Sequence, residues 1–99
     1  MEEPPYKEYK FEWDPEKAAI NLKKHGVSFE IATEVFDDEN RVEFFDLSHS
    51  DYEDRYITIG MVKNILSVVY TERGERIRLI SARRATAQER RIYNGHGIL

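Results

Sequence analysis

The fold is decided by residues 55–83, which read RYITIGMVKNILSVVYTERGERIRLISAR. Three runs in this stretch are rich in β-branched and aromatic residues, and short polar connections at Lys63-Asn64 and Arg73-Gly74 separate them. Such composition is typical of strands, and connections of hairpin length place consecutive strands antiparallel. We therefore predict an antiparallel meander of three strands, over residues 55–62, 65–72 and 76–83.

Three helices flank this meander, and each has a capping residue at its start. Asp14, Ser28 and Thr86 can each accept a free backbone N–H, and Pro15 suits the first helical position. Gly26 can end the first helix in a left-handed conformation. We predict helices that begin at Pro15, Ser28 and Thr86 and extend to about residues 25, 36 and 94.

Two further strands are predicted before the meander. Residues 41–47 form one, and the polar loop 48–54 follows it. Residues 9–13 alternate aromatic and charged side chains, which is the period of a half-buried strand. The predicted class is α+β, with N-terminal helices and a C-terminal helix packed on one face of an antiparallel sheet of about four strands. At this length the chain is one domain, 1–99, with loose ends at residues 1–8 and 95–99.

Composition excludes several classes of protein. The chain has 99 residues, no cysteine and a formal net charge of −4, which excludes disulfide scaffolds, thiolate metal sites and cysteine nucleophiles. Its apolar runs are too short to span a bilayer. The first five residues, MEEPP, are acidic and broken by proline, unlike the start of a signal peptide. We therefore expect a cytoplasmic protein that does not contact a membrane.

Positive charge is concentrated late in the chain. Residues 1–47 carry 13 acidic and 6 basic side chains, whereas residues 48–99 carry 6 and 9. Arginines dominate this later part, and a guanidinium binds phosphate in a bidentate manner. The cluster consists of Arg73, Arg76, Arg78, Arg83, Arg84, Arg90 and Arg91. It predicts either a local anion site, with several cations lining one concavity, or a solvated face paired with acidic groups.

Strict alternation along residues 76–83 predicts how these arginines divide between the faces of the sheet. Arg76 and Arg78 share one face, and Ile77 and Leu79 the other. The same alternation places Arg83 on the side of Ile77.

No metal site is apparent, because the three histidines lie far apart and the acidic runs 37–39 and 51–54 lack calcium-loop spacing. Cleavage of RNA without a metal needs a base, cations and an acid. Glu53 or His49 could act as the base, and Tyr70 or His49 could donate a proton. Charge could be stabilised by Arg55, Arg73, Arg78 and Arg83, and bases could stack on Tyr52, Tyr56, Tyr70 and Tyr93. Each of these residues also has an ordinary structural interpretation, such as an ion pair between Glu53 and Arg55.

Several ordered blocks of the sequence form a recognisable pattern. They include residues 13–17 (WDPEK), 21–29 (NLKKHGVSF), 53–56 (EDRY), 68–74 (VVYTERG) and 77–83 (IRLISAR). Together these blocks resemble the BrnT family of toxins. The resemblance covers about residues 11–94. It implies a fold like that of the RelE and ParE toxins, RNA cleavage that inhibits translation, and neutralisation by a BrnA-like ribbon-helix-helix antitoxin. The complex of toxin and antitoxin is expected to repress its own operator DNA.

The resemblance also supports specific residue roles. We expect catalytic roles for Glu53, Arg55, Arg73 and Arg83, and RNA contacts from Arg76, Arg78, Arg84, Tyr70 and His49, with no metal and no cofactor. The alternative is a non-catalytic module whose arginine face docks an antitoxin or nucleic acid. Poisoning of gyrase is a third possibility.

Overall fold

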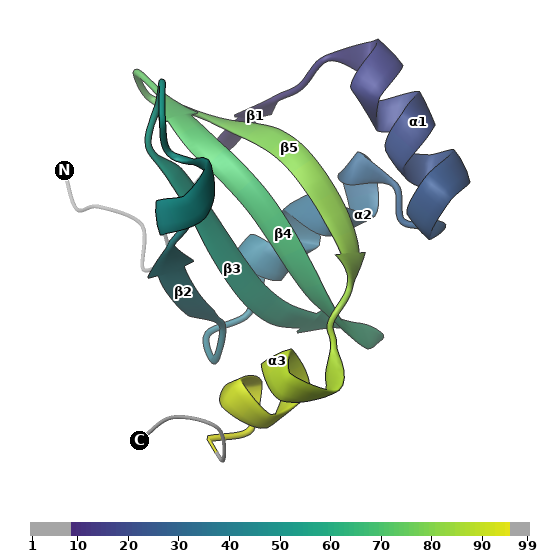
Figure 1. The fold of residues 1–99 in the computed structure, drawn as a ribbon. Helices are drawn as coiled ribbons and strands as arrows, with labels where there is room; N and C mark the ends of the chain where they lie inside the picture. The colour runs from purple at the N-terminus through teal and green to yellow at the C-terminus, as the bar shows by residue number, and fades with distance from the viewer. Residues whose placement is uncertain (1–8, 96–99) are drawn as a thin grey trace, which may run out of the picture.

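A computed structural model describes residues 9–95, which form a sheet with helices on one side, at one edge and at one end (Figure 1). The strands are β1 (Lys10–Glu12), β2 (Val42–Phe45), β3 (Arg55–Val62), β4 (Asn64–Arg73) and β5 (Arg76–Arg84). The helices are α1 (Pro15–His25), α2 (Phe29–Thr33) and α3 (Ala87–Tyr93), with short 3-10 helices η1 (Glu34–Asp37) and η2 (Leu47–His49). The predicted loose ends lie outside the described residues, except for Gly95.

The meander is confirmed, but the predicted sheet of about four antiparallel strands differs from the structure in the number of strands and in the direction of one of them. The sheet has five strands in the order β1-β5-β4-β3-β2, and β1 pairs with β5 in parallel. Parallel strands need a long connection, unlike the strands of a hairpin. Here β1 and β2 are the two edge strands, and the helices between them carry the chain from one edge of the sheet to the other (Figure 1). β1 covers part of the outer edge of β5, which the meander alone leaves unpaired.

The predicted caps form where the sequence places them. The carboxylate of Asp14 accepts the N–H of Glu16 at 2.9 Å, and Gly26 adopts φ 71° after α1. Ser28 caps α2, and Thr86 and Glu89 form a capping box at α3. The second helix is shorter than predicted, because its last turn tightens into the 3-10 helix η1.

The core lies between the sheet and the α2–η1 segment. Phe29, Ala32 and Val35 are fully buried there against β4 and β5. Gly60 on β3 permits this close packing, since a Cβ at that position would lie 2.7 Å from a methyl group of Val35. The opposite face of the sheet, which we call the open face, is covered among residues 9–95 by α3 only at one end, where Ser67 donates to Glu89 (Figure 1).

The helices do not all cover one face, in contrast to the prediction. α1 flanks the edge of β5, and α3 lies across one end of the sheet (Figure 1). α3 is anchored there by the Tyr93 hydroxyl, which donates to Asp38 at 2.5 Å. This hydrogen bond raises the pKa of Tyr93 to about 12. Among the described residues, none of the helices is long and apolar enough to cross a membrane.

Asn21 joins α1 to the edge of β5. Its side chain is buried, accepts the N–H of Ala82 at 3.1 Å, and donates to the carbonyls of Ala82 and Val27 at 2.8 and 3.0 Å. Within residues 9–95, β1 pairs only with residues 76–78 of β5. The amide of Asn21 therefore takes the place of a neighbouring strand farther along β5.

We predict that Asn21→Leu lowers the free energy of unfolding by about 2–4 kcal/mol, because three buried backbone groups lose their partner. Chemical denaturation checks this value. Lys23→Ala on the exposed side of α1 is the control and should change stability by at most about 0.5 kcal/mol. An Asn21→Leu variant as stable as the wild type would contradict the proposed role of the amide.

Candidate functional site on the open face

The register of the sheet assigns side chains to the open face. Leu66, Val68 and Tyr70 of β4 are buried in the core. Their neighbours Ser67 and Thr71 therefore point to the open face, together with the residues paired to them. Arg55 pairs with Thr71 across β3, and Arg78 pairs with Thr71 across β5.

A β-bulge changes the alternation within β5. Val69 pairs with Ser81 and Tyr70 pairs with Leu79, so Ile80 has no partner on β4. The bulge inserts one residue between the two halves of β5, so each later side chain lies on the face opposite to the one that strict alternation predicts. Ala82 consequently enters the core with 0% exposure, and Arg83, paired with Ser67, lies on the open face.

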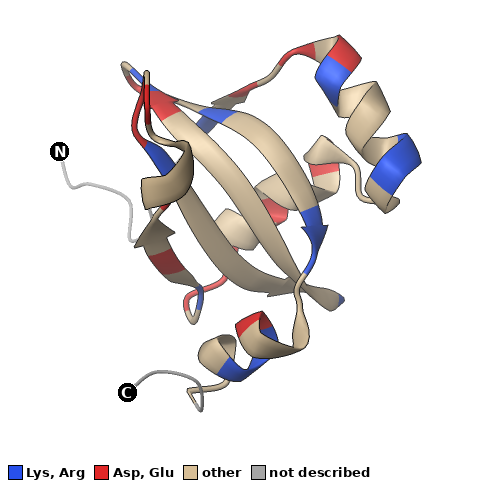
Figure 2. Cartoon of the chain, viewed as in Figure 1, with Lys and Arg blue, Asp and Glu red and all other residues tan. Residues whose placement is uncertain are grey.

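The prediction that Arg83 lies on the side of Ile77 is therefore wrong, since it assumed strict alternation. Arg73 pairs with Arg76 beside the β4–β5 turn and joins the same face. The open-face arginines are Arg55, Arg73, Arg76, Arg78 and Arg83. Figure 2 shows basic residues at both ends of β5, with acidic residues near the turn.

The open-face arginines are held by three glutamates. Glu53 lies between two of them, with its Oε1 3.3 Å from Arg73 Nη2 and its Oε2 3.8 Å from Arg55 Nε. Among the described residues, Arg55 Nε is a buried donor without a hydrogen-bond partner. An unpaired buried donor is rare in proteins, and here the Glu53 carboxylate lies beside Nε but too far away for a hydrogen bond.

The second glutamate, Glu12 on β1, lies beside the middle of the row. Arg78 Nη1 donates to Glu12 at 2.9 Å, and Arg76 Nε lies 3.9 Å from the same carboxylate. These contacts follow from the parallel pairing of β1 with β5, which places Glu12 opposite Arg78. The sequence did not predict this position of Glu12, because hairpin turns reveal only the pairing of strands that are consecutive in the chain.

The third glutamate, Glu89 of α3, holds Arg83 at the far end. Arg83 donates to both carboxylate oxygens, at 2.7 and 3.1 Å, and Ser67 donates at 3.2 Å. Glu89 also accepts the backbone N–H of Thr86. Burial opposes ionisation of Glu89, but the bonds from Arg83 and Thr86 outweigh it, and the pKa of Glu89 falls below its usual value.

The open-face arginines share a face but do not share one pocket. Residues 76 and 83 stand at opposite ends of β5, about 20 Å apart at 3.3 Å per residue. Glu53, Arg55 and Arg73 form one cluster, and His49 lines a cavity of about 190 Å³ with Glu53 and Arg55. The structure therefore brings together three of the four expected catalytic residues and leaves Arg83 apart from them.

Two predicted RNA contacts lie away from the open face. Arg84 pairs with Leu66 and follows Arg83, so it faces the other side of the sheet. Tyr70 is buried among the core residues, and its hydroxyl donates to Glu43. Burial and this hydrogen bond raise the pKa of Tyr70 well above its ordinary value. Tyr70 therefore cannot donate a proton to a phosphate held by Arg55 and Arg73.

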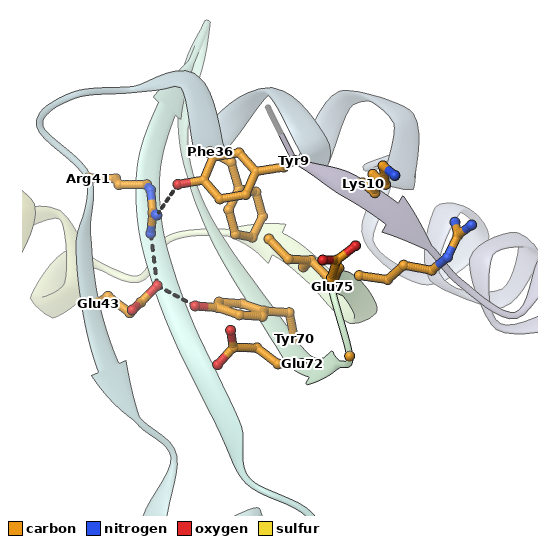
Figure 3. Close-up of a pocket in the computed structure, with 11 residues that line it drawn as sticks. Tyr9, Lys10, Phe36, Arg41, Glu43, Tyr70, Glu72 and Glu75 are labelled. Atoms are coloured by element: carbon orange, nitrogen blue, oxygen red, sulfur yellow. Dashed lines mark hydrogen bonds and ion pairs between the residues drawn. The ribbon is translucent and has the colours of Figure 1, made fainter. Parts of the chain in front are cut away.

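The side of the sheet that carries Tyr70 has a larger cavity, of about 560 Å³, which the sequence did not indicate (Figure 3). Arg41 lies over the ring of Phe36 and donates to Glu43 at 2.8 Å and to Thr58 at 3.0 Å. Glu43 in turn accepts the hydroxyl of Tyr70. These bonds satisfy the charged groups internally, so we interpret this arrangement as a structural support between β2 and the core.

The described residues do not gather metal-binding side chains, since no group of three or more His, Asp or Glu residues is placed to hold an ion. What the open face offers is a row of guanidiniums, each near a partly exposed carboxylate, and one carboxylate beside a cavity. Such a row fits successive phosphates of a single strand.

The comparisons with known proteins agree with this picture. Residues 13–89 match the family model described as "Ribonuclease toxin, BrnT, of type II toxin-antitoxin system". The chain belongs to the BrnT family. This family membership confirms the resemblance seen in the sequence blocks, and it identifies the chain as a ribonuclease toxin of a type II toxin–antitoxin system, with an antitoxin as partner.

A solved BrnT structure has a similar fold. The ribonuclease toxin BrnT of Brucella abortus superposes with a TM-score of 0.63 at 26% identity, over 80% of this chain and 99% of that chain. None of the curated proteins matches the sequence. The α+β class and the BrnT architecture are thus established for this chain.

The lowered pKa of Glu89 predicts a pH-dependent contribution to stability. A carboxylate with a depressed pKa stabilises the fold above its unfolded-state pKa of about 4.5, and this contribution disappears as the pH falls through the folded-state value. Glu89→Gln should therefore cost about 1 kcal/mol at pH 7, and the difference from wild type should shrink at pH 3.

Thermal denaturation of both proteins from pH 7 to pH 3 measures this difference. Glu39→Gln, in the exposed turn before β2, is the control and should behave like the wild type. A deficit of Glu89→Gln that stays constant over the whole range would show that ionisation of Glu89 does not stabilise the fold.

Proposed function

We propose that this BrnT-family chain is a metal-independent endoribonuclease that binds single-stranded RNA across the open face of its sheet. The observation that carries the proposal is the bulged strand β5, which directs Arg83 to the same face as Arg76 and Arg78. An RNA strand laid along β5 would meet cations over about 20 Å. The exposed aromatic side chain of Tyr52 stands beside the cavity at Glu53 and offers a base a surface for stacking.

RNA can compete for these arginines. Arg73 and Arg76 are 53% and 56% exposed at the side chain, and exposed ion pairs of this kind contribute little to stability. A phosphate offers a guanidinium the same bidentate geometry as a carboxylate. The glutamates therefore hold the arginines in place without RNA and release them at low cost when phosphates arrive.

We assign the chemistry to the cluster of Glu53, Arg55 and Arg73. Glu53 acts as the base and removes the proton of the RNA 2′-hydroxyl, whose oxygen then attacks the neighbouring phosphorus. Arg55 and Arg73 stabilise the charge that develops on the phosphoryl oxygens, through the solvent-accessible parts of side chains that are 31% and 53% exposed. In this assignment Arg76, Arg78 and Arg83 position the flanking nucleotides.

We also propose a protein partner, a DNA target and a cellular location for this toxin. A BrnA-like antitoxin with a ribbon-helix-helix part would cover the open face with an acidic segment and thereby neutralise the toxin. Through this antitoxin the complex would bind operator DNA. Cleavage of cellular RNA would inhibit translation and place the protein in the cytoplasm. The BrnT sheet and its helices support a relationship to RelE toxins.

Cleavage of RNA in the presence of EDTA tests the proposed activity. We expect the purified protein to cleave, and Arg55→Ala combined with Arg73→Ala to lower kcat/KM by 100-fold or more, by loss of charge stabilisation. Lys23→Ala combined with Lys24→Ala removes the same charge from α1 and is the matched control. Wild-type cleavage that requires a divalent metal, or that survives the arginine double substitution, would contradict the proposal.

Growth on induction separates the enzyme from a binding module. An enzyme should arrest growth when it is induced without an antitoxin, and Glu53→Gln should relieve the arrest while the protein stays folded. Arrest that persists with Glu53→Gln would favour the non-catalytic alternative, in which the arginine face only docks a partner.

Two adjacent arginines test the assignment of faces. Arg83→Ala should raise KM several-fold, leave kcat nearly unchanged, and lower the salt dependence of RNA binding by about one phosphate contact. Arg84→Ala removes the same charge from the other side of the sheet and should have a much smaller effect. Equal effects of the two substitutions would show that RNA does not follow the open face.

A further inference from the structure

A pair of side chains at the rim of the open face is not used by the chemistry assigned so far. Asp46 follows β2, and its side chain is only 9% exposed. Both of its carboxylate oxygens lie within 3.3 Å of His49 Nδ1, and Ser48 donates to Oδ1 at 3.1 Å. The His49 side chain is 67% exposed.

This pair sits next to the cluster of Glu53, Arg55 and Arg73. The backbone N–H of Asp46 donates to the carbonyl of Arg55, and Ser50 links the carbonyl of Asp46 to the N–H of Arg55. The turn that carries His49 is therefore fixed to the start of β3. His49 also lines the same 190 Å³ cavity as Glu53 and Arg55.

The geometry has a chemical consequence for the imidazole. A carboxylate can only accept a hydrogen bond, so Asp46 holds the proton of His49 on Nδ1. The other ring nitrogen, Nε2, then remains available to exchange a proton with a ligand. Asp46 occupies the N-cap position of η2 but makes no capping bond to its backbone. Its carboxylate bonds to side chains instead.

We propose that His49 is the general acid of RNA cleavage and that Asp46 is its positioning residue, an inference that rests on the function proposed above. As the 2′-oxygen forms its bond to phosphorus, the bond from phosphorus to the 5′-oxygen breaks. Protonated His49 gives its Nε2 proton to this departing oxygen, while Glu53 keeps the proton of the 2′-hydroxyl. The products are a 2′,3′-cyclic phosphate and a free 5′-hydroxyl, and no further reactant is needed.

The sequence suggested two proton donors, Tyr70 and His49, and the structure is compatible only with His49. Tyr70 is buried on the opposite face, with its hydroxyl bound to Glu43. The cavity at His49 has the volume of about six water molecules at liquid density, enough for one phosphate group. His49 and Glu53 both line this space, as acid and base must if they act on one phosphodiester.

The test uses a short RNA with one cleavable linkage and the same RNA with sulfur in place of the departing 5′-oxygen, because a thiolate leaves without being protonated. On the normal RNA, His49→Ala should lower kcat 100-fold or more, and Asp46→Asn at least 10-fold, with little change in KM. On the sulfur substrate both variants should cleave within a few-fold of wild type. Glu53→Gln should stay slow on both substrates.

The outcomes separate this inference from the proposed function. Equal losses on both substrates for His49→Ala and Asp46→Asn would overturn the acid role, although RNA cleavage itself would stand. A wild type that cleaves neither substrate would overturn both proposals. His25→Ala on α1 is the matched control and should cleave both substrates at the wild-type rate.

A spectroscopic measurement tests Asp46 without activity, and it applies even where Asp46→Asn folds poorly. In nitrogen-15 NMR spectra of the wild type, the neutral ring of His49 should carry its proton on Nδ1, the tautomer that is less common in free histidine. Ser48→Ala should preserve this tautomer. A neutral His49 protonated at Nε2 would overturn the role of Asp46.

Discussion

The open face depends on one interruption in β5. Ile80 has no partner on β4, so the strand changes its facing between Leu79 and Ala82. Ala82 can then complete the core, and the backbone beside it is held by the amide of Asn21. A regular strand would instead direct Arg83 toward the helices, where a charged side chain would need a buried partner. The bulge thus reconciles a continuous core with arginines at both ends of the same face of β5.

The two faces of the sheet manage their charged groups in different ways. On the helix side, Arg41 is held by Glu43 and Thr58 in a set of bonds that supports the core. On the open face, glutamates from three separate elements each neutralise nearby arginines. This arrangement is how a chain with a net charge of −4 would carry the proposed surface for a polyanion. The negative charges hold the guanidiniums in place, and under the proposed function phosphates replace them.

Much of the fold is predictable because it is encoded locally. Asp14, Gly26 and Thr86 act as caps within a few residues of their positions, and short turns determine the meander. The parallel pairing of β1 is not local, because it depends on where the helices carry the chain. The bulge could not be predicted from the sequence either, since the run of Leu79, Ile80 and Ser81 contains no glycine or proline to mark it.

The candidate site was predicted in part for the same reasons. Glu53, Arg55 and Arg73 meet because an antiparallel hairpin brings the ends of β3 and β4 together. The sequence did not mark Asp46 as a candidate, because the positioning role proposed for it depends on its burial and on its contact with His49 in a loop. Tyr70 was misplaced because strand alternation alone does not say which face the helices cover.

The central claim, that RNA lies along the bulged β5 on the open face, can be measured by NMR. A short RNA with 2′-O-methyl groups cannot be cleaved by the proposed route and can be titrated into the isotope-labelled protein. We predict that the largest shifts fall on residues 67, 71, 78, 81 and 83, with small changes along α1 and α2. Shifts concentrated on the helices or around the cavity at Arg41 would contradict the account.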